Sequence, residues 1–171
     1  MADGTLKVGE ITNSAGSGNI TIGSGVTVNV NRPSFSVTLS TSQTISTATV
    51  TKIQFDTVVL DTDSCYSTSN YRFTPTQAGK YIFLTTTRIE GTGANANSRI
   101  LKNGSLVSFV IAENSASGQE TFNNIIVLDM NGSTDYVEAY AEQNAGSDKS
   151  VYGDNAGAGS TTFHGYKLIG A

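Results

Sequence analysis

Few side chains in this sequence are suited to acid–base, nucleophilic or redox chemistry. The chain has one histidine, His164, and one cysteine, Cys65. His164 stands between Phe163 and Gly165 in an expected strand, and the sequence offers it no recognisable nucleophile and acid, so we do not expect a catalytic triad. Cys65 is followed by Tyr66 and has no basic neighbour to lower its pKa, which favours a small buried residue over a reactive thiol.

Oxygen ligands for a cation occur at two places in the chain. Asp61 and Asp63 flank one threonine, and further Asp and Asn side chains lie in the glycine-rich stretch 146–159. Such loops can bind calcium, but acidic residues around a threonine are also common in ordinary turns. One histidine and one cysteine cannot close a zinc site within one chain, and no glycine-rich loop precedes a helix to hold a phosphate. We therefore expect no metal, no cofactor and no enzymatic activity.

Length, composition and charge narrow the class of protein further. The 171 residues suit one domain with a single core, and seven Phe with seven Tyr argue against disorder. The net charge of -4 leaves no basic field that would bind nucleic acid. No apolar run approaches the roughly 20 residues that span a bilayer, and the first residues lack the pattern of a secretory signal. We expect neither nucleic acid nor a membrane as a partner.

Alternating apolar and polar residues predict β-strands and no helices. Runs of this kind lie at Phe35–Leu39, Ile53–Phe55, Tyr71–Phe73, Tyr81–Phe83 and Val137–Ala141. Short stretches of Gly, Asn, Asp and Ser separate them, which is typical of an antiparallel sandwich or barrel. Asn103-Gly104 predicts a hairpin with a type I′ turn, and Asn131-Gly132 predicts a hairpin with a longer loop. Gly165, near the expected last strand, should permit the close approach of a neighbouring aromatic ring.

The composition changes near Pro33. Residues 1–32 contain a Gly/Ser-rich stretch between short apolar pieces, each too short to bury its apolar edge alone. We interpret 1–32 as an extended N-terminal β arm that needs partners, with a strand pair on the main domain as the alternative. Residues 33–171 then form a head. The arm residues that we expect to anchor on a partner are Leu6, Val8, Ile11, Ile20, Ile22, Val26 and Val28.

Some expected strands have no polar face. Val58–Leu60 and Ile125–Leu128 are apolar at consecutive positions, and 106–111 is nearly so. In a two-sheet sandwich in water, each strand should have one polar face, formed by every second residue. A bulge, covering loops or another subunit must shield the second face, and a subunit interface would explain several such runs together.

Six short stretches follow one another in a specific order. They are Ile53–Asp56, Cys65-Tyr66, Tyr71–Pro75, Ala78–Phe83, Leu101–Gly104 and Thr162–Ile169. From Phe35 onward the sequence thereby resembles the complement C1q-like branch of the tumour necrosis factor-like jelly rolls. This resemblance implies an all-β, antiparallel jelly-roll sandwich that assembles as a homotrimer, with aromatic residues of the inner sheet along the axis. By position, the candidates for that lining are Tyr81, Tyr136, Tyr140 and Tyr166.

The chain also departs from the animal members of this family. It has no collagen-like repeat, secretory signal or transmembrane anchor, so the complement and cytokine roles do not carry over. A Gly/Ser-rich arm followed directly by such a head instead resembles structural proteins of bacteriophages. We therefore expect a non-enzymatic homotrimer on the virion surface, assembled in the host cytoplasm, that decorates or cements the capsid. Its arm would bind the major capsid protein or another virion protein, and its head would project outward.

Two other functions compete with this hypothesis. The protein could be the receptor-binding tip of a tail fibre, which would bind a host glycan through the polar loops 92–98, 114–120 and 146–160. A freestanding lectin or signalling ligand, unrelated to virions, is the third hypothesis.

Overall fold

The computed structural model describes residue 24 and residues 32–113, 118–154 and 161–168. The chain divides into two units, Met1–Asn31 and Arg32–Ala171, and all the described strands belong to the second. The seven apolar residues that we expect to anchor the arm, from Leu6 to Val28, lie outside the described residues.

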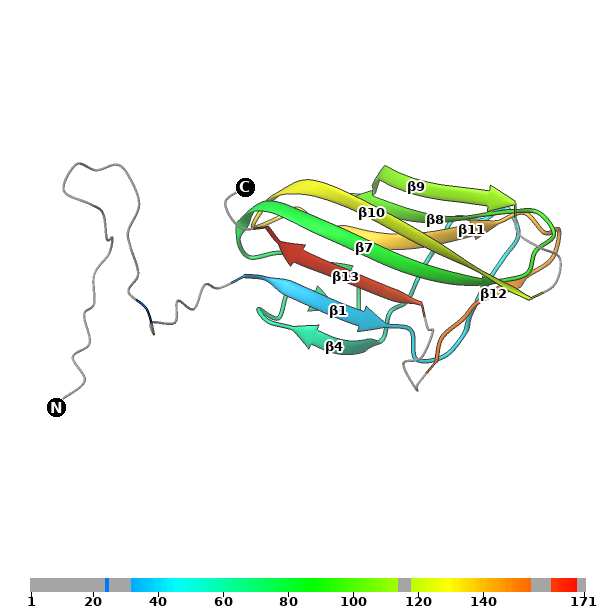
Figure 1. Ribbon diagram of the computed structural model, residues 1–171, viewed down its shortest axis with the longest axis horizontal. Helices are drawn as coiled ribbons and strands as arrows, with labels where there is room; N and C mark the ends of the chain where they lie inside the picture. Colours follow the sequence, from blue (N-terminus) through cyan, green and yellow to red (C-terminus); the bar gives the residue numbers. More distant parts are fainter. Residues whose placement is uncertain (1–23, 25–31, 114–117, 155–160, 169–171) are drawn as a thin grey trace. The chain divides into compact units, whose positions relative to one another are not determined.

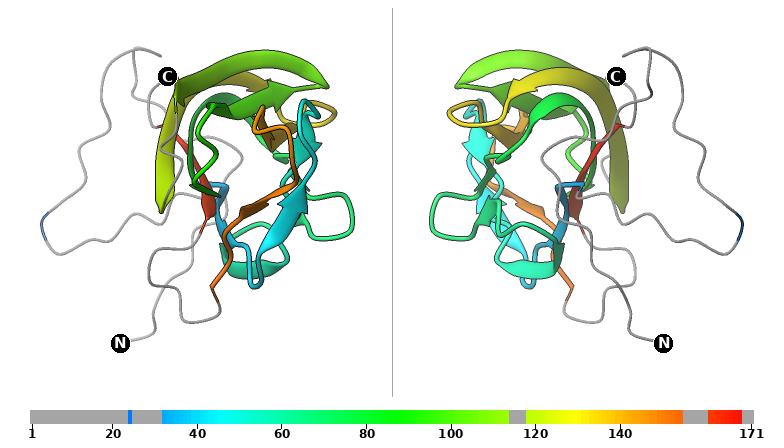
Figure 2. Two further views of the ribbon diagram at one scale, coloured as in Figure 1. Left: turned by 90° about the vertical axis from the view of Figure 1, so that its right-hand side faces the viewer. Right: turned by 90° about the vertical axis from the view of Figure 1, so that its left-hand side faces the viewer.

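Arg32–Ala171 is a sandwich of two antiparallel sheets, and no helix occurs among its described residues (Figure 1). In sheet A, β10, β7, β13, β1 and β4 are neighbours in that order, while β12 and β2 continue from the far end of β7. In sheet B the order is β5, β6, β11, β8 and β9, and β3 pairs with β11. Figure 2 shows the sheets curling around a shared interior.

The strands of sheet A are β1 (Ser34–Thr38), β2 (Gln43–Ile45), β4 (Thr57–Asp61), β7 (Ala78–Glu90), β10 (Gln119–Asn131), β12 (Lys149–Val151) and β13 (Thr162–Lys167). Those of sheet B are β3 (Thr51–Lys52), β5 (Tyr66–Ser67), β6 (Arg72–Phe73), β8 (Asn95–Lys102), β9 (Ser105–Glu113) and β11 (Val137–Gln143).

The core lies between the sheets and consists mainly of aromatic rings. The rings of Phe35 in sheet A and Phe73 in sheet B stack with centroids 4.4 Å apart, which joins the two layers. Phe83 is also fully buried, as the alternating pattern predicts, and Phe163 is fully buried beside it. Tyr71 departs from the pattern, because it lies in the turn before β6 with a φ of 52° rather than in a strand. Ring packing of this kind adds to the free energy of apolar burial.

Of the two predicted hairpins, the first is confirmed and the second is wrong, because β10 lies in sheet A and β11 in sheet B, so the turn between them joins the two sheets. Asn103 and Gly104, between β8 and β9, have φ values of 52° and 78°, the positive pair that a type I′ turn requires. The connection from β10 to β11 is longer. There the Asn131 side-chain oxygen accepts the backbone N–H groups of Ser133, Thr134 and Asp135 at 3.0, 2.9 and 3.0 Å.

Gly165 makes the close approach that we expected. It pairs with Phe35 on β1 and Phe83 on β7, and the rings of both neighbours fill the space that a side chain would occupy. A Cβ placed on Gly165 would lie 2.4 Å from Cε1 of Phe35 and 2.8 Å from Cδ1 of Phe83. Only glycine therefore fits at this position without displacing the core.

Candidate functional site

The outer surface of sheet A, on the side away from sheet B, carries a band of apolar side chains. Antiparallel register aligns Val127, Ile82 and Tyr166 across β10, β7 and β13. The next row aligns Ile125, Leu84 and His164, and continues through Ser36 to Leu60 on β4. We call the apolar members of these rows the apolar band: Ile82, Leu84, Ile125, Val127, Tyr166 and Leu60.

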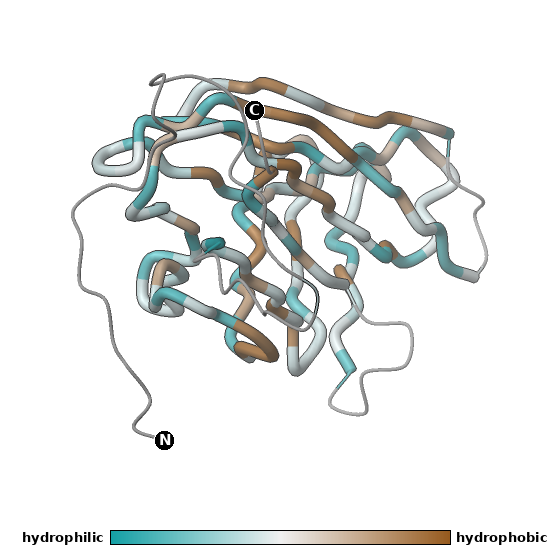
Figure 3. Tube along the Cα trace, turned by 60° about the vertical axis from the view of Figure 1, so that its left-hand side comes forward, coloured by the Kyte–Doolittle hydropathy of each residue, from teal (hydrophilic) through white to brown (hydrophobic). Residues whose placement is uncertain are grey.

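Much of the apolar band is accessible in the single chain. The exposed fractions are 59% for Ile125, 49% for Val127 and 45% for Tyr166. Figure 3 shows that hydrophobic residues, coloured brown, recur along several strands. A contiguous exposed apolar patch on a globular domain usually marks an interaction surface.

Polar side chains border the apolar band at both ends. At one end Lys80 Nζ lies 2.7 Å from Asp129 Oδ1 in an ion pair between β7 and β10. At the other end the Thr86 hydroxyl donates a 2.9 Å hydrogen bond to the side-chain oxygen of Asn123. An apolar centre with a polar rim is the usual composition of a protein–protein interface.

His164 lies within the same rows and has an unusual environment. Its Nδ1 atom is buried and has no hydrogen-bond partner among the described residues. Burial lowers the pKa of the imidazole, because a charged ring would lose hydration there. An imidazole held neutral, with Nδ1 unpartnered among the described residues, fits an apolar surface.

A second apolar patch lies on β9, at the edge of sheet B. Phe109 and Ile111 are 53% and 49% exposed, and Leu106 near the start of β9 is 47% exposed. Strands β9 and β10 run along the same edge of the sandwich (Figure 1), so this patch and the apolar band flank that edge from its two sides.

The structure distinguishes between the explanations for strands without a polar face. Bulges do occur, between Ser36 and Val37 where β1 pairs with β4, and between Ile100 and Leu101 where β8 pairs with β9. They do not cover the second face, since Val59 on β4 remains 66% exposed. The loops of the described residues do not cover it either, so these side chains stay accessible in the part of the chain that the structure describes.

The four tyrosines predicted for the trimer axis are not brought together. For Tyr81 the prediction is wrong, because its ring is fully buried between the sheets and its hydroxyl donates a 2.8 Å hydrogen bond to the Gln77 carbonyl. Alternation on β7 turns Tyr81 inward and Ile82 outward. Tyr166 lies on the outer face of sheet A, within the apolar band.

Tyr136 lies directly before β11 and Tyr140 lies within β11, on the side of the other sheet. The Arg72 guanidinium sits 4.5 Å from the centroid of the Tyr136 ring. The Tyr140 hydroxyl donates a 3.1 Å hydrogen bond to Glu138, and burial together with the negative charge of Glu138 raises the pKa of Tyr140 to about 12. Both tyrosines are thus engaged on the outer face of sheet B, away from Tyr166.

The suspected calcium ligands serve to close a turn. The two oxygens of Asp61 accept the backbone N–H groups of Cys65 and Tyr66, each at 2.9 Å. Asp63 accepts the Thr76 hydroxyl at 3.3 Å. Cys65 itself is buried, as expected, and burial raises the pKa of its thiol. Within the described part of the chain, no group of three or more His, Cys, Asp or Glu side chains is arranged to hold a metal ion.

The predicted glycan-binding loops differ from the observed connections. Residues 95–98 of the first loop belong to strand β8, so that prediction is wrong for this part. Residues 114–117 and 155–160, in the other two loops, lie outside the described residues.

Sequence reasoning also missed two members of the apolar band, Ile82 and Leu84. A signal was present, because Tyr81–Leu84 is apolar at four consecutive positions, as in the other strands that lack a polar face.

Two antiparallel sheets in this strand order define a jelly-roll sandwich of the tumour necrosis factor and C1q type. The C1q domain family matches residues 34–168, nearly the whole of Arg32–Ala171, and the chain belongs to this family. The resemblance to the C1q-like jelly rolls that the sequence suggested is thereby confirmed. No match was found among curated proteins.

Solved structures agree on the fold. The globular domain of the zebrafish complement 1qA protein is similar with a TM-score of 0.56 at 17% identity, over 80% of this chain and 98% of that one. Murine APRIL at pH 5.0 is similar with a TM-score of 0.63 at 10% identity, over 81% of this chain and 100% of that one. At these identities the likeness concerns the fold alone. Among the described residues, no helix is long and apolar enough to cross a membrane.

Proposed function

We propose that this protein is a non-enzymatic homotrimer in which each head buries its apolar band against a neighbouring copy. The observation that carries this proposal is the exposure of the band in the single chain, with Ile125 59% accessible at its centre. A surface of this kind favours association, because water is released from apolar area on contact.

The positions of the two apolar patches support a closed ring. The patch on β9 and the apolar band lie on different surfaces of the same head, so they can meet only between different molecules. Contacts between unlike patches generate rings when the rotation closes. A trimer in which the β9–β10 edge of one head packs on the sheet A face of the next would bury both.

Replacing Ile125 by glutamate tests the interface. Burial of the accessible part of this side chain contributes about 1–2 kcal/mol per subunit, and a buried carboxylate would add a desolvation penalty. Sedimentation velocity should show a trimer for the unaltered protein and a folded monomer for Ile125→Glu. The matched control is Ser46→Glu, which adds the same charge at an exposed position between β2 and β3. A monomeric unaltered protein at micromolar concentration would contradict the proposal.

For the biological role, we propose capsid decoration on a bacteriophage virion. The proposal rests on the resemblance to phage structural proteins that we infer from the Gly/Ser-rich segment with short apolar pieces before the head. Three such arms joined in one trimer would bind neighbouring capsid subunits with added avidity, because linked weak contacts multiply. The heads would then lie on the virion surface.

Two measurements test this role. Removal of residues 2–31 should abolish attachment to purified capsids while the head remains a trimer in sedimentation. Quantitative mass spectrometry of virions should find hundreds of copies per particle. A truncated protein that still coats capsids would exclude the arm as the anchor.

The second candidate is the receptor-binding tip of a tail fibre. It is favoured by rigid polar loops such as Asn131–Tyr136, in which the Asn131 side chain satisfies three backbone N–H groups while Ser133 and Thr134 stay exposed. A few to a few dozen copies located at the tail would support this candidate over decoration.

A further inference from the structure

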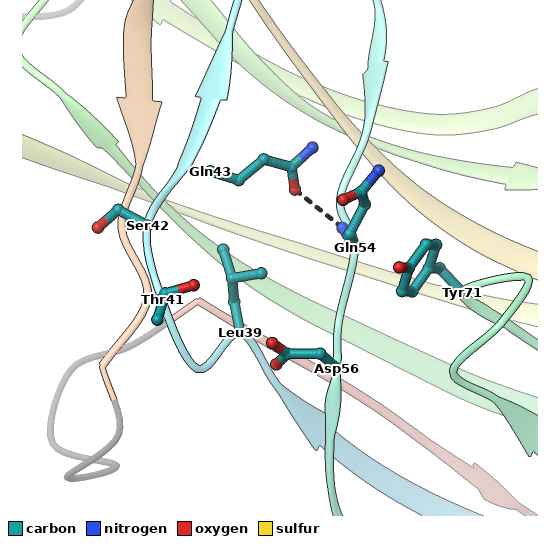
Figure 4. Close-up of a pocket in the computed structure, with 7 residues that line it drawn as sticks. All are labelled: Leu39, Thr41, Ser42, Gln43, Gln54, Asp56 and Tyr71. Carbon is teal, nitrogen blue, oxygen red and sulfur yellow. Dashed lines mark hydrogen bonds between the residues drawn. The ribbon is translucent and has the colours of Figure 1, made fainter.

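A small pocket lies within a single head, apart from the apolar band. Three segments form it: the connection from β1 to β2, the segment between β3 and β4, and the turn before β6 (Figure 4). Its volume is about 180 Å³. This is below the roughly 300–1,000 Å³ of pockets for drug-sized ligands, and suits a ligand of one small ring. The lining residues are Leu39, Thr41, Ser42, Gln43, Gln54, Asp56 and Tyr71.

Two side chains hold the walls of the pocket together. Gln43 Oε1 accepts the backbone N–H of Gln54 at 2.9 Å, and its amide nitrogen donates to the Lys52 carbonyl at 2.8 Å. Asp56 accepts the backbone N–H of Ser40 at 2.8 Å, and its other oxygen accepts the Ser40 hydroxyl. The pocket is therefore largely formed before any ligand arrives, which lowers the entropic cost of binding.

Other polar groups of the lining have no partner within the described residues. The side chains of Gln54, Thr41 and Tyr71 make no hydrogen bond there, and in Figure 4 the Tyr71 hydroxyl points toward the pocket. Gln54 and Thr41 are exposed at the rim. The lining thus offers an amide and two hydroxyl groups, which can each donate and accept.

Tyr71 has a backbone conformation that is unfavourable for a bulky side chain. Its φ of 52° is uncommon for a bulky residue and is usually found where function or packing requires it. The ring forms one wall of the pocket, and the buried Leu39 supplies an apolar surface beside it.

The charge of the lining excludes several classes of ligand. It contains no Lys, Arg or His to attract an anion, and Asp56 is its single carboxylate, too few for a metal ion. Partial burial of Asp56 favours its protonated form, but the hydrogen bonds from Ser40 and Thr57 outweigh this and lower its pKa. Asp56 therefore remains a charged acceptor at neutral pH, with its charge already stabilised by the chain.

We propose that this pocket binds one pyranose ring of a carbohydrate. Such a ring presents hydroxyl groups around its edge, for Gln54, Thr41 and Asp56, and a C–H face for the ring of Tyr71. The site is complete within one chain, so it depends neither on the trimer nor on the location of the protein in a virion.

Titration with methyl pyranosides of glucose, galactose, mannose and N-acetylglucosamine tests the site, with backbone amide NMR shifts as the readout. We expect at least one glycoside to bind with a Kd on the order of 1–10 mM, because a single sugar ring is a small ligand. The shifts should centre on residues 39–43, 54–56 and 71. Absence of saturable binding, or shifts centred elsewhere, would overturn the proposal. Amide shifts in response to methylammonium chloride but to none of the glycosides would also overturn it.

Three variants localise the binding. Gln54→Ala should weaken it about fivefold through the lost hydrogen bonds. Gln119→Ala removes the same group from an exposed position at the start of β10 and should leave the Kd unchanged. Tyr71→Gly removes the ring but suits the positive φ, so it should abolish binding in a folded head. Equal affinity in Gln54→Ala and Gln119→Ala would contradict the site.

The Ile125→Glu variant separates this proposal from the trimer. If the pocket is complete within one chain, the monomeric variant should bind the glycoside as tightly as the unaltered protein. Binding lost in Ile125→Glu but present in the trimer would mean that the pocket needs a second subunit, which contradicts the site as proposed.

Discussion

Replacing Gly165 by alanine should destabilise the head strongly for a change of one methyl group. The new Cβ would lie 2.4 Å from Phe35 and 2.8 Å from Phe83, closer than real Cβ contacts occur. Neither ring can move easily, because both are fully buried and Phe35 also stacks on Phe73 at 4.4 Å. Overpacking of a core costs about 1–3 kcal/mol, and two clashing rings place this case at the upper end. Loss of glycine entropy from the unfolded chain offsets about 0.5–1 kcal/mol, which leaves a net loss of about 2 kcal/mol.

For a domain of this size, such a loss corresponds to a Tm lower by roughly 6–10 °C, which calorimetry would measure. The variant Phe35→Leu, combined with Gly165→Ala in a double-mutant cycle, tests the cause. Relief of the clash should make the double variant more stable than the sum of the single effects predicts. A Gly165→Ala protein as stable as the unaltered one would refute the reasoning, because it would mean that the two rings adapt at no cost.

The remaining predictions concern single polar groups. Burial lowers the pKa of His164 below its usual 6.5, so the unfolded chain binds more protons below that pH and stability falls on acidification. His164→Gln should therefore lose less stability than the unaltered protein between about pH 7 and about pH 5 in urea unfolding, and equal losses would contradict this. Asp61→Ala should cost about 2 kcal/mol through two lost charge-assisted hydrogen bonds, equally with and without EDTA. A cost that disappears in EDTA would indicate a bound cation. Lys52→Met leaves Glu138, only 5% exposed at its side chain, without its ion pair and should cost about 2 kcal/mol. Adding Glu138→Gln should recover part of that loss in chemical denaturation, and no recovery would count against an unpaired charge as the cause.

Local features of the fold could be predicted from the sequence because they depend on neighbouring residues. Alternation of Phe35, Val37 and Leu39 predicted their burial, and all three lie in the core. The hairpin at Asn103-Gly104 followed from the backbone freedom of these two residues. The order of short motifs pointed to the C1q family, which the match over residues 34–168 bears out.

The alternation of residues along a strand could not by itself show which face of the strand points into the core. Tyr81 and Ile82 are both large and apolar, so either could have been the core residue. Packing decided it, because the side of β7 that carries Tyr81 and Phe83 meets the rings of sheet B, including Phe73. The error in the prediction for Tyr81 arose from this ambiguity.

The sequence by itself determined that the chain alternates as strands, turns at its Asn-Gly pairs and carries more apolar surface than one sandwich can hide. Only the tertiary structure decided where that surplus lies. Ile82, Ile125 and Tyr166 come from distant parts of the chain, and cross-strand register aligns them in the apolar band. The pocket has the same origin, since Thr41, Gln54 and Tyr71 meet only through long-range pairing of their segments. Register and strand order depend on contacts between residues that are far apart in the sequence. A local sequence pattern does not contain information about those contacts.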